Sequence, residues 1–199
     1  MVTWLRKKNP FPVDDIGSVA ITELIEYIKT NLSSYAWITG EHIIWIVDNN
    51  NKRRFNIVND RIRAVQGHLT SFLPIDLEKA MVRIIDSRTV IHGTKEDTLC
   101  NYIIPSGYLD CMGRQTIHFA PGLPEDGVTS GIRTSGDMKS DVIMYVDMNK
   151  VLEDGIPFYE ALNGVIVSPG VNNKLPLKYI SKIVRLSDKT EWTGSEFKK

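Results

Sequence analysis

The spacing of apolar residues switches from helical to strand-like within residues 18–65, and this switch limits the folds that the chain can adopt. In residues 18–32 the apolar side chains recur at the i, i+3, i+4, i+7 and i+11 positions, which predicts one buried face of an amphipathic helix. A second helix is expected to begin at Thr39, a residue type that caps helix N-termini, and to end in the asparagine turn at 49–51. The apolar face of the first helix consists of Ile21, Leu24, Ile25, Ile28 and Leu32.

The alternating pattern that follows predicts a β-hairpin. Residues 54–58 and 61–65 carry apolar side chains at every second position, and Asn59-Asp60 between them suits a two-residue turn. The basic run at 52–54 is then interpreted as a solvated edge of the hairpin. Two helices followed by a hairpin predict a winged-helix-like lobe, to which we assign residues 1–75.

Residues 76–199 are expected to form a second lobe that is rich in strands. Residues 70–88 connect the lobes and include a helical stretch near 77–85. A further helix is expected at 97–104, ending at Pro105 and Gly107, and one or two helical turns at 149–162. Because these helices do not alternate strictly with strands, the pattern predicts an α+β fold. The predicted strands are 90–94, 116–120, 141–147, 165–168 and 180–186.

The composition excludes several classes of protein. Apolar residues make up 42% of the 199 residues, enough for a core, and the formal net charge of +0 argues against nonspecific coating of nucleic acid. Cys100 and Cys111 lack metal-ligand spacing and are interpreted as buried or free thiols. No apolar run has the length of a signal peptide or a membrane span. We expect a monomeric intracellular protein, cytoplasmic or nuclear, without a metal or a membrane partner.

The four histidines and the arginines are the residues that could carry chemistry. His42, His68, His92 and His118 lack the spacing of a zinc-binding helix, and the chain has no P-loop and no serine nucleophile elbow. Taken singly, each histidine is more often a structural residue, and each arginine is more often a solvated surface charge. A guanidinium can nevertheless bind phosphate through two parallel hydrogen bonds.

Six stretches together resemble the NAD-dependent tRNA (RNA) 2'-phosphotransferase family. They occur in the order that the family shows and extend over roughly residues 11–186. Each is weak alone, but their shared order and spacing make the resemblance specific. The stretches are Phe11–Ile25, Arg63–His68 (RAVQGH), His92–Thr94 (HGT), Gly107–Phe119 (GYLDCMGRQTIHF), Gly127–Arg133 (GVTSGIR) and Phe158–Ile166 (FYEALNGVI).

The resemblance implies a fold and a reaction. The fold is an N-terminal winged-helix lobe and a C-terminal ADP-ribosyltransferase lobe, with the site between them. In the reaction, an internal RNA 2'-phosphate attacks C1'' of the nicotinamide ribose of NAD, which is consumed, and nicotinamide leaves. The ribose O2'' then attacks the phosphate, which releases RNA with a 2'-OH and ADP-ribose 1'',2''-cyclic phosphate. The implied partner is therefore RNA or tRNA that carries a 2'-phosphate from a splice junction.

The resemblance also implies roles for individual residues. Arg63 and Arg133 are expected to position the 2'-phosphate and to stabilise charge in the second step, as fixed cations must. Arg61, by contrast, is interpreted as a surface residue of the hairpin. The residues expected to bind NAD, with His68 close to NAD or the RNA phosphate, are His68, His92, Gly93, Thr94, Gly107, Leu109, Arg114, His118, Ser130, Gly131 and Val165.

The sequence departs from the family at three places. The family carries an Arg-His pair on an N-terminal helix. An alignment without gaps puts Thr3 and Trp4 in that place, whereas a shorter connection would put Arg6 and Lys7 there, with Arg6 as a catalytic residue. The family's serine after His68 is Leu69, and the first histidine of its HIHF segment is Thr116. These departures bear on the second step more than on ADP-ribosyl transfer.

Two alternatives therefore remain open. One is an ADP-ribosyltransferase of the same fold that stops after the first step and modifies terminal phosphates of RNA or DNA. The other is a module of the same fold that binds nucleic acid without catalysis.

Overall fold

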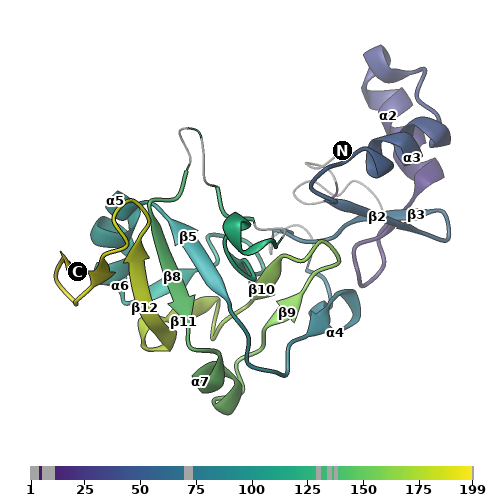
Figure 1. Cartoon of the computed structure of the whole chain (residues 1–199). Coiled ribbons are helices and arrows are strands. Elements are labelled where there is room, and N and C mark those ends of the chain that lie inside the picture. The colour runs from purple at the N-terminus through teal and green to yellow at the C-terminus, as the bar shows by residue number, and fades with distance from the viewer. Residues whose placement is uncertain are drawn as a thin grey trace. The chain divides into compact units, whose positions relative to one another are not determined.

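The computed structural model describes residues 5, 12–69, 74–128, 131–133, 136 and 139–198. The fold is mixed α and β, with several antiparallel sheets and few helices (Figure 1). The chain divides into two compact units. The first unit comprises Met1–Val82 with the short segments Gly113–Gln115 and Ala161–Asn163, and the second comprises Arg83–Met112, Thr116–Glu160 and Gly164–Lys199.

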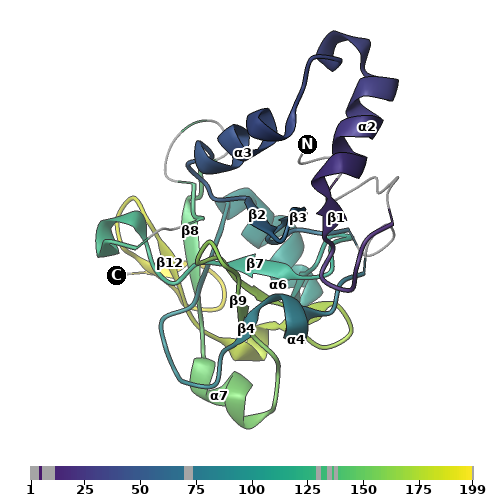
Figure 2. The same cartoon turned by 90° about the vertical axis from the view of Figure 1, so that its right-hand side faces the viewer.

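The first unit places helices α2 and α3 on one side of a three-stranded antiparallel sheet of order β1-β3-β2 (Figure 2). The predicted helices and hairpin are confirmed, and the first helix begins at Ile21, the first residue of its apolar face. The elements are β1 (Val19–Ala20), α2 (Ile21–Asn31), a 3-10 turn (Ser33–Tyr35), α3 (Gly40–Asp48), β2 (Phe55–Val58), β3 (Arg61–Ala64) and α4 (Leu77–Ala80).

Local chemistry explains these elements. Thr39 caps α3 together with His42, whose ring nitrogen accepts from the Thr39 backbone N–H. Asn59 and Asp60 both have positive φ, 50° and 58°, the conformation of the two-residue turn that matches the twist of a hairpin. The predicted helix face is buried at Ile21, Leu24 and Ile28 against the sheet and completes the core of this unit.

The second unit contains three antiparallel sheets, of order β14-β13-β12-β8-β5, β4-β9-β10-β7 and β11-β6. Its strands are β4 (Val82–Arg83, at the unit boundary), β5 (Ile91–Thr94), β6 (Tyr108–Asp110), β7 (Ile117–Phe119), β8 (Val142–Val146), β9 (Tyr159–Glu160), β10 (Ile166–Ser168), β11 (Lys174–Pro176), β12 (Ile180–Arg185), β13 (Glu191–Trp192) and β14 (Phe197–Lys198). Its helical segments are α5 (Glu96–Thr98), a π-helical turn (Leu99–Ile103), α6 (Ile104–Ser106), α7 (Met148–Glu153) and 3-10 turns at Pro124–Asp126 and Leu177–Tyr179.

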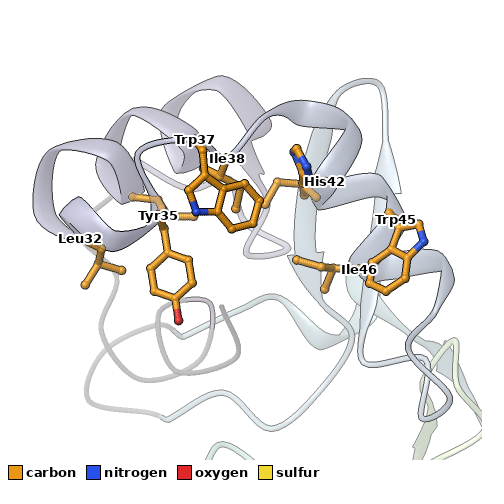
Figure 3. A pocket seen from close by; sticks show the side chains of 9 residues that line it. Leu32, Tyr35, Trp37, Ile38, His42, Trp45 and Ile46 are labelled. Carbon is orange, nitrogen blue, oxygen red and sulfur yellow. The ribbon is translucent and has the colours of Figure 1, made fainter.

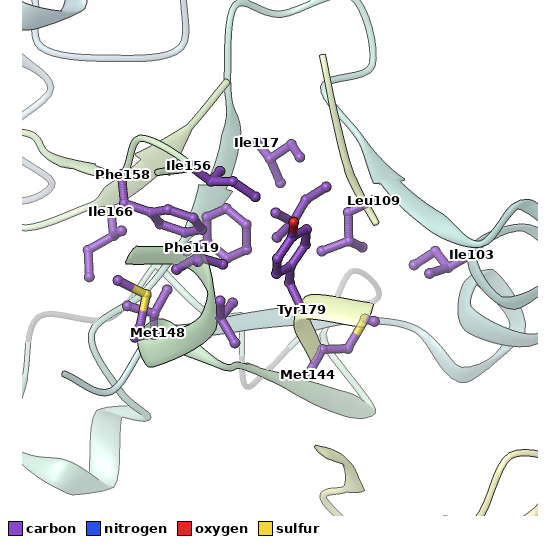
Figure 4. Packing of buried hydrophobic residues seen from close by; sticks show 14 of the residues in the cluster. Ile103, Leu109, Ile117, Phe119, Met144, Met148, Ile156, Phe158, Ile166 and Tyr179 are labelled. Atoms are coloured by element: carbon purple, nitrogen blue, oxygen red, sulfur yellow. The ribbon is translucent and has the colours of Figure 1, made fainter. Parts of the chain in front are cut away.

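The core of the second unit is built on the inward faces of β7, β8 and β10 (Figure 4). Phe119 and Phe158 pack with ring centroids 5.2 Å apart, and Met144 and Ile166 are buried in the same cluster. An antiparallel bridge between Ile91 and Ala120 ties β5 to the end of β7. The five predicted strands of this lobe are confirmed, each within one or two residues of its expected ends.

Two helix predictions need correction, and a third is confirmed to within two residues at each end. The stretch 77–85 is helical only to Ala80, because residues 82–83 form a strand and the Ile84 backbone N–H binds the Phe158 carbonyl. The stretch 149–162 is helical only to Glu153, because Gly155 turns with φ 70°. The helix predicted at 97–104 extends past Pro105 to Ser106 and ends at Gly107, whose φ of 78° suits a helix C-cap.

Candidate functional site

His92 lies on β5 and is held by the backbone of β7. Its Nδ1 is 2.9 Å from the carbonyl oxygen of His118. A carbonyl can only accept, so Nδ1 carries the proton in this hydrogen bond. Burial lowers the pKa of His92, which outweighs the opposite effect of that carbonyl and favours the neutral ring. Nε2 of His92 is therefore a hydrogen-bond acceptor with a fixed orientation.

Gly93 is the next residue on β5, and the chain passes close to its Cα. A Cβ at this position would lie 2.6 Å from Ser140 Oγ and 2.8 Å from Ile132 Cδ1. Both atoms belong to the segments that precede β8. Only glycine fits here without displacing these side chains, so the residue keeps a bare backbone next to His92.

The segments around residues 131–141 are tied to β5 by their backbone. The Ser140 N–H donates to the Arg133 carbonyl at 2.7 Å, and the Asp141 N–H donates to the Thr94 carbonyl at 2.9 Å. Ile132 packs against the cluster that contains Ile91. Arg133 itself is exposed. The second unit thus brings His92, His118, Gly93, Thr94 and the Arg133 segment into one region.

Arg63 belongs to the first unit and is buried, with 8% of its surface exposed. Its Nη2 donates to the Ala80 carbonyl at 3.1 Å, whereas its buried Nη1 has no hydrogen-bond partner among the residues that the structure describes. Burial lowers the pKa of the guanidinium, and the charge of Asp14 acts in the opposite direction. A guanidinium remains charged even so. The arrangement leaves a buried cation with one donor group that has no partner among the described residues.

Arg61 lies two residues before Arg63 on β3 and has a different environment. It is 3.3 Å from Asp14 through Nε, and its Nη2 donates to the Ser18 carbonyl at 2.7 Å. The prediction that Arg61 is a surface residue is incomplete, because this side chain ties the loop before β1 to the hairpin.

Two further predicted residues meet in the first unit. His68 is buried, and its carbonyl accepts from the Gln115 backbone N–H at 3.0 Å. Leu69 forms an antiparallel bridge with Arg114, whose side chain is exposed. The Gln115 side-chain amide contacts both backbone groups of Ile75. Gln115 therefore fixes the strand-like segment that carries His68, and sequence reasoning gave it no such role.

Four of the residues that were predicted to bind NAD either have a structural role or make few contacts among the described residues. Gly107 caps the helix before β6, and its carbonyl accepts from Leu177 N–H. The Leu109 side chain lies in the hydrophobic core. Gly131 is exposed, and Val165 precedes β10 and is half-buried. Arg6 and Ser130 lie outside the described residues, as does Lys7.

The described residues also bear on two kinds of chemistry, that of a bound metal ion and that of a reactive thiol. No group of three or more histidine, cysteine, aspartate or glutamate side chains among them could hold a metal ion. Burial, with a smaller contribution from Asp110, raises the pKa of the Cys111 thiol to about 11, so the thiol stays protonated at neutral pH.

None of the helices in the described parts of the chain is both long and apolar enough to cross a bilayer.

Ser140 is a neighbour of the site that sequence reasoning missed. It lies two residues before β8, after a run of mostly polar residues, and no sequence motif distinguishes it from its neighbours. Its hydroxyl is brought against Gly93 by the pairing of β5 with β8, in which Gly93 is opposite Ile143 and Thr94 is opposite Val142. The available signal was the glycine, because a bare backbone in a strand indicates a close approach by another group.

Comparison with known proteins identifies the family. Residues 4–170 match the model of the RNA 2'-phosphotransferase, Tpt1/KptA family. The chain is 32% identical over 187 residues to tRNA 2'-phosphotransferase 1 of Bos taurus, covering 90% of this chain and 69% of that protein. It is 30% identical over 191 residues to tRNA 2'-phosphotransferase of Saccharomyces cerevisiae, with 89% and 76% covered. A probable RNA 2'-phosphotransferase of Rhizobium johnstonii is 30% identical over 171 residues, with 85% and 82% covered. The chain therefore belongs to the RNA 2'-phosphotransferase, Tpt1/KptA family of transferase enzymes.

Proposed function

We propose that the chain removes an internal 2'-phosphate from RNA, such as a tRNA splice junction, by transferring it to the ribose of NAD. The products are RNA with a 2'-OH, nicotinamide and ADP-ribose 1'',2''-cyclic phosphate. The observation that carries the proposal is Arg63, a buried guanidinium whose Nη1 has no described partner. An unpaired buried charge lowers stability, so its presence is best explained by an anionic ligand.

The second unit is proposed to bind NAD, which supplies an electrophilic ribose carbon and a neutral leaving group. His92 Nε2, as an acceptor held by the His118 carbonyl, would receive a hydrogen bond from a ribose hydroxyl. The backbone of Gly93 would hold the nicotinamide amide. Arg133 is exposed beside these residues and would contact the transferred phosphate as a fixed cation.

The architecture fits the same proposal at a finer level. The order of two helices and a hairpin in the first unit supports a winged-helix-like lobe, which we propose contacts RNA. The packed antiparallel sheets of the second unit, with the His92 ring hydrogen-bonded to the backbone carbonyl of His118, support an ADP-ribosyltransferase-like lobe.

A short RNA with one internal 2'-phosphate, radiolabelled at that phosphate, tests the function. The RNA is incubated with NAD and the products are separated by chromatography. Label in ADP-ribose cyclic phosphate is the expected result. Label that stays on ADP-ribosylated RNA would mean that the chain stops after the first step, which is the alternative that the departure at the family's Arg-His pair favours. Unchanged RNA, together with unchanged 5'-phosphorylated RNA and DNA, would contradict the proposed activity.

His92→Ala is expected to weaken NAD binding roughly tenfold, because it removes one hydrogen bond from a partly buried site. Isothermal titration with NAD measures this change. In the wild type the affinity should stay constant as the pH falls from about 8 to 6.5, since burial lowers the pKa of His92 and keeps the ring neutral. His42→Ala, which alters a helix cap in the first unit, is the control and should leave NAD affinity unchanged.

The same pKa shift has a consequence for stability. The unfolded chain binds a proton at His92 near pH 6.5, and the folded protein resists that proton. The contribution of His92 to stability is therefore complete above about pH 6.5 and is lost as the pH falls further, through the lowered pKa of the folded state. Melting curves of His92→Ala should show a weaker acid dependence than those of the wild type.

An unchanged NAD affinity of His92→Ala in the isothermal titration would remove this residue from the proposed site.

A further inference from the structure

The helices of the first unit carry an unusual group of exposed aromatic side chains. Tyr35, Trp37 and Trp45 are 50%, 61% and 66% exposed. With His42 they border a hollow of about 380 Å³ between α2, the turn at 33–35 and α3 (Figure 3). We call these four residues the aromatic platform. Exposed aromatic groups of this extent on a soluble protein mark a surface that binds a partner.

Two rings of the platform, those of Trp37 and His42, are held in place by their own unit. The Trp37 indole N–H donates to the Ser34 carbonyl at 3.0 Å, and its ring meets the His42 ring edge-on at 4.9 Å. His42 is fixed in turn through Nδ1, which lies 2.7 Å from the Thr39 hydroxyl. These two side chains would lose little freedom on binding, so their rings are prepared for a flat ligand.

The turn at the end of α3 offers positive charge to a polyanion. Residues 21–54 as a whole hold four basic and four acidic residues, but three of the basic ones are consecutive at 52–54. Two of the cations, Lys52 and Arg53, are exposed in the turn that follows α3. This turn is joined to the end of the helix, because Asn49 donates to the Trp45 carbonyl at 2.9 Å and Arg53 N–H donates to Asn50 at 2.7 Å. A nucleic acid strand presents both flat apolar bases and phosphates.

We propose that the aromatic platform binds unpaired bases of the RNA substrate, with Lys52 and Arg53 contacting the neighbouring phosphates. The inference rests on the proposed function, since that function makes RNA the partner. Bases that are not in a duplex stack on tryptophan and tyrosine faces, and one splayed base would enter the hollow. The platform would thus recognise single-stranded nucleotides near the 2'-phosphate and disfavour a continuous duplex.

Binding of an RNA without a 2'-phosphate tests the platform alone. The probe is a fluorescein-labelled oligoadenylate of about ten nucleotides, a length within the range that such sites occupy. Trp37→Ala and Trp45→Ala should each weaken binding roughly tenfold by fluorescence anisotropy, while Trp37→Phe should keep most of the affinity. Tyr102→Ala removes an equally exposed aromatic ring from the second unit and should have no effect. Circular dichroism checks that each variant is folded.

The salt dependence of the same titration tests the charged part of the surface. Removing the two cations in Lys52→Ala/Arg53→Ala should reduce the slope of log affinity against log salt by roughly 1.4, about 0.7 for each phosphate contact on a single strand. The tryptophan variants should leave this slope unchanged, because they carry no charge. Equal slopes in the wild type and the double variant would contradict the proposed phosphate contacts.

Turnover separates this inference from the proposed function. On a 2'-phosphorylated dinucleotide, which has no further nucleotides that could stack on the platform, the tryptophan variants should match the wild type. On a longer single-stranded substrate they should raise KM without lowering kcat. Equal KM values and equal oligoadenylate binding in wild type and variants would overturn the platform as an RNA surface and leave the enzyme activity standing. A wild type that binds the oligoadenylate through Trp37 but transfers no phosphate would overturn the proposed function instead.

Discussion

Arg63→Met is expected to lower 2'-phosphate transfer by about 10²–10³-fold while changing stability little. The loss of activity follows if the guanidinium stabilises charge on the transferred phosphate, because one such donor in a buried site has an effect of this size. Stability should change little because the lost hydrogen bond to Ala80 is offset by removal of a buried, incompletely paired charge. Single-turnover assays and thermal melting measure the two quantities in the same preparation.

Arg61→Met is the matched control for this variant. Both arginines lie on β3, two residues apart, and both are replaced by the same flexible apolar side chain. Arg61 pairs with Asp14 and donates to the Ser18 carbonyl, so its loss should lower the melting temperature and spare turnover. If Arg63 were only structural, Arg63→Met would destabilise the protein and its turnover per folded molecule would be unchanged. That result would sink the assignment of Arg63 to the phosphate site.

The contrast between the two arginines shows what the sequence could predict. The alternation around Ile62 placed both arginines on the face of β3 opposite Ile62, because strand geometry has a period of two. Burial was a different matter. Arg63 is covered by the segment at Ala80, which is distant in sequence, and no local pattern contains that contact. The family resemblance selected Arg63 over Arg61, whereas the structure supplied the physical difference between them.

The helices also show which features of burial the sequence could and could not predict. The spacing in residues 18–32 predicted α2 correctly because a helix face that is buried on a sheet must repeat with the helical period. For α3, however, the sequence predicted a helix without saying which of its apolar residues are buried, and only Ile43 of α3 is buried. Trp45 is exposed instead. Hydrophobicity alone does not separate a core residue from an aromatic residue of a binding surface, so the platform was not predicted.

The contact between His92 and the backbone of His118 could not be read from spacing either. It depends on the bridge between Ile91 and Ala120, which joins β5 of one sheet to the end of β7 in another. The two histidines that this bridge brings together are 26 residues apart in the sequence. The local patterns predicted both strands, and the resemblance placed both histidines at the NAD site. The tautomer of His92 follows only from the carbonyl that the fold sets beside it.

Arg133→Ala is expected to reduce formation of ADP-ribose cyclic phosphate by about 10²–10³-fold, again because a fixed cation at the transferred phosphate is lost. Arg133 is exposed, so its removal should change the free energy of unfolding by no more than about 0.5 kcal/mol. The yield of ADP-ribose cyclic phosphate from Arg133→Lys should lie between those of the wild type and Arg133→Ala, since lysine keeps the charge but not the two parallel donors of arginine. Lys139→Ala is the control, because it removes a neighbouring exposed cation and should leave turnover intact.

Two products must be measured for Arg133→Ala, because the residue can act in either step of the proposed reaction. Nicotinamide release reports attack of the 2'-phosphate on the ribose, and labelled cyclic phosphate reports the transfer that follows. If both fall together, Arg133 positions the 2'-phosphate for the first attack. If nicotinamide is released at the normal rate while label accumulates on ADP-ribosylated RNA, Arg133 stabilises charge in the second step. Ile132 anchors this segment against the cluster around Ile91, so the backbone should keep its place in the variant. Normal yields of both products would therefore mean that Arg133 is not part of the site.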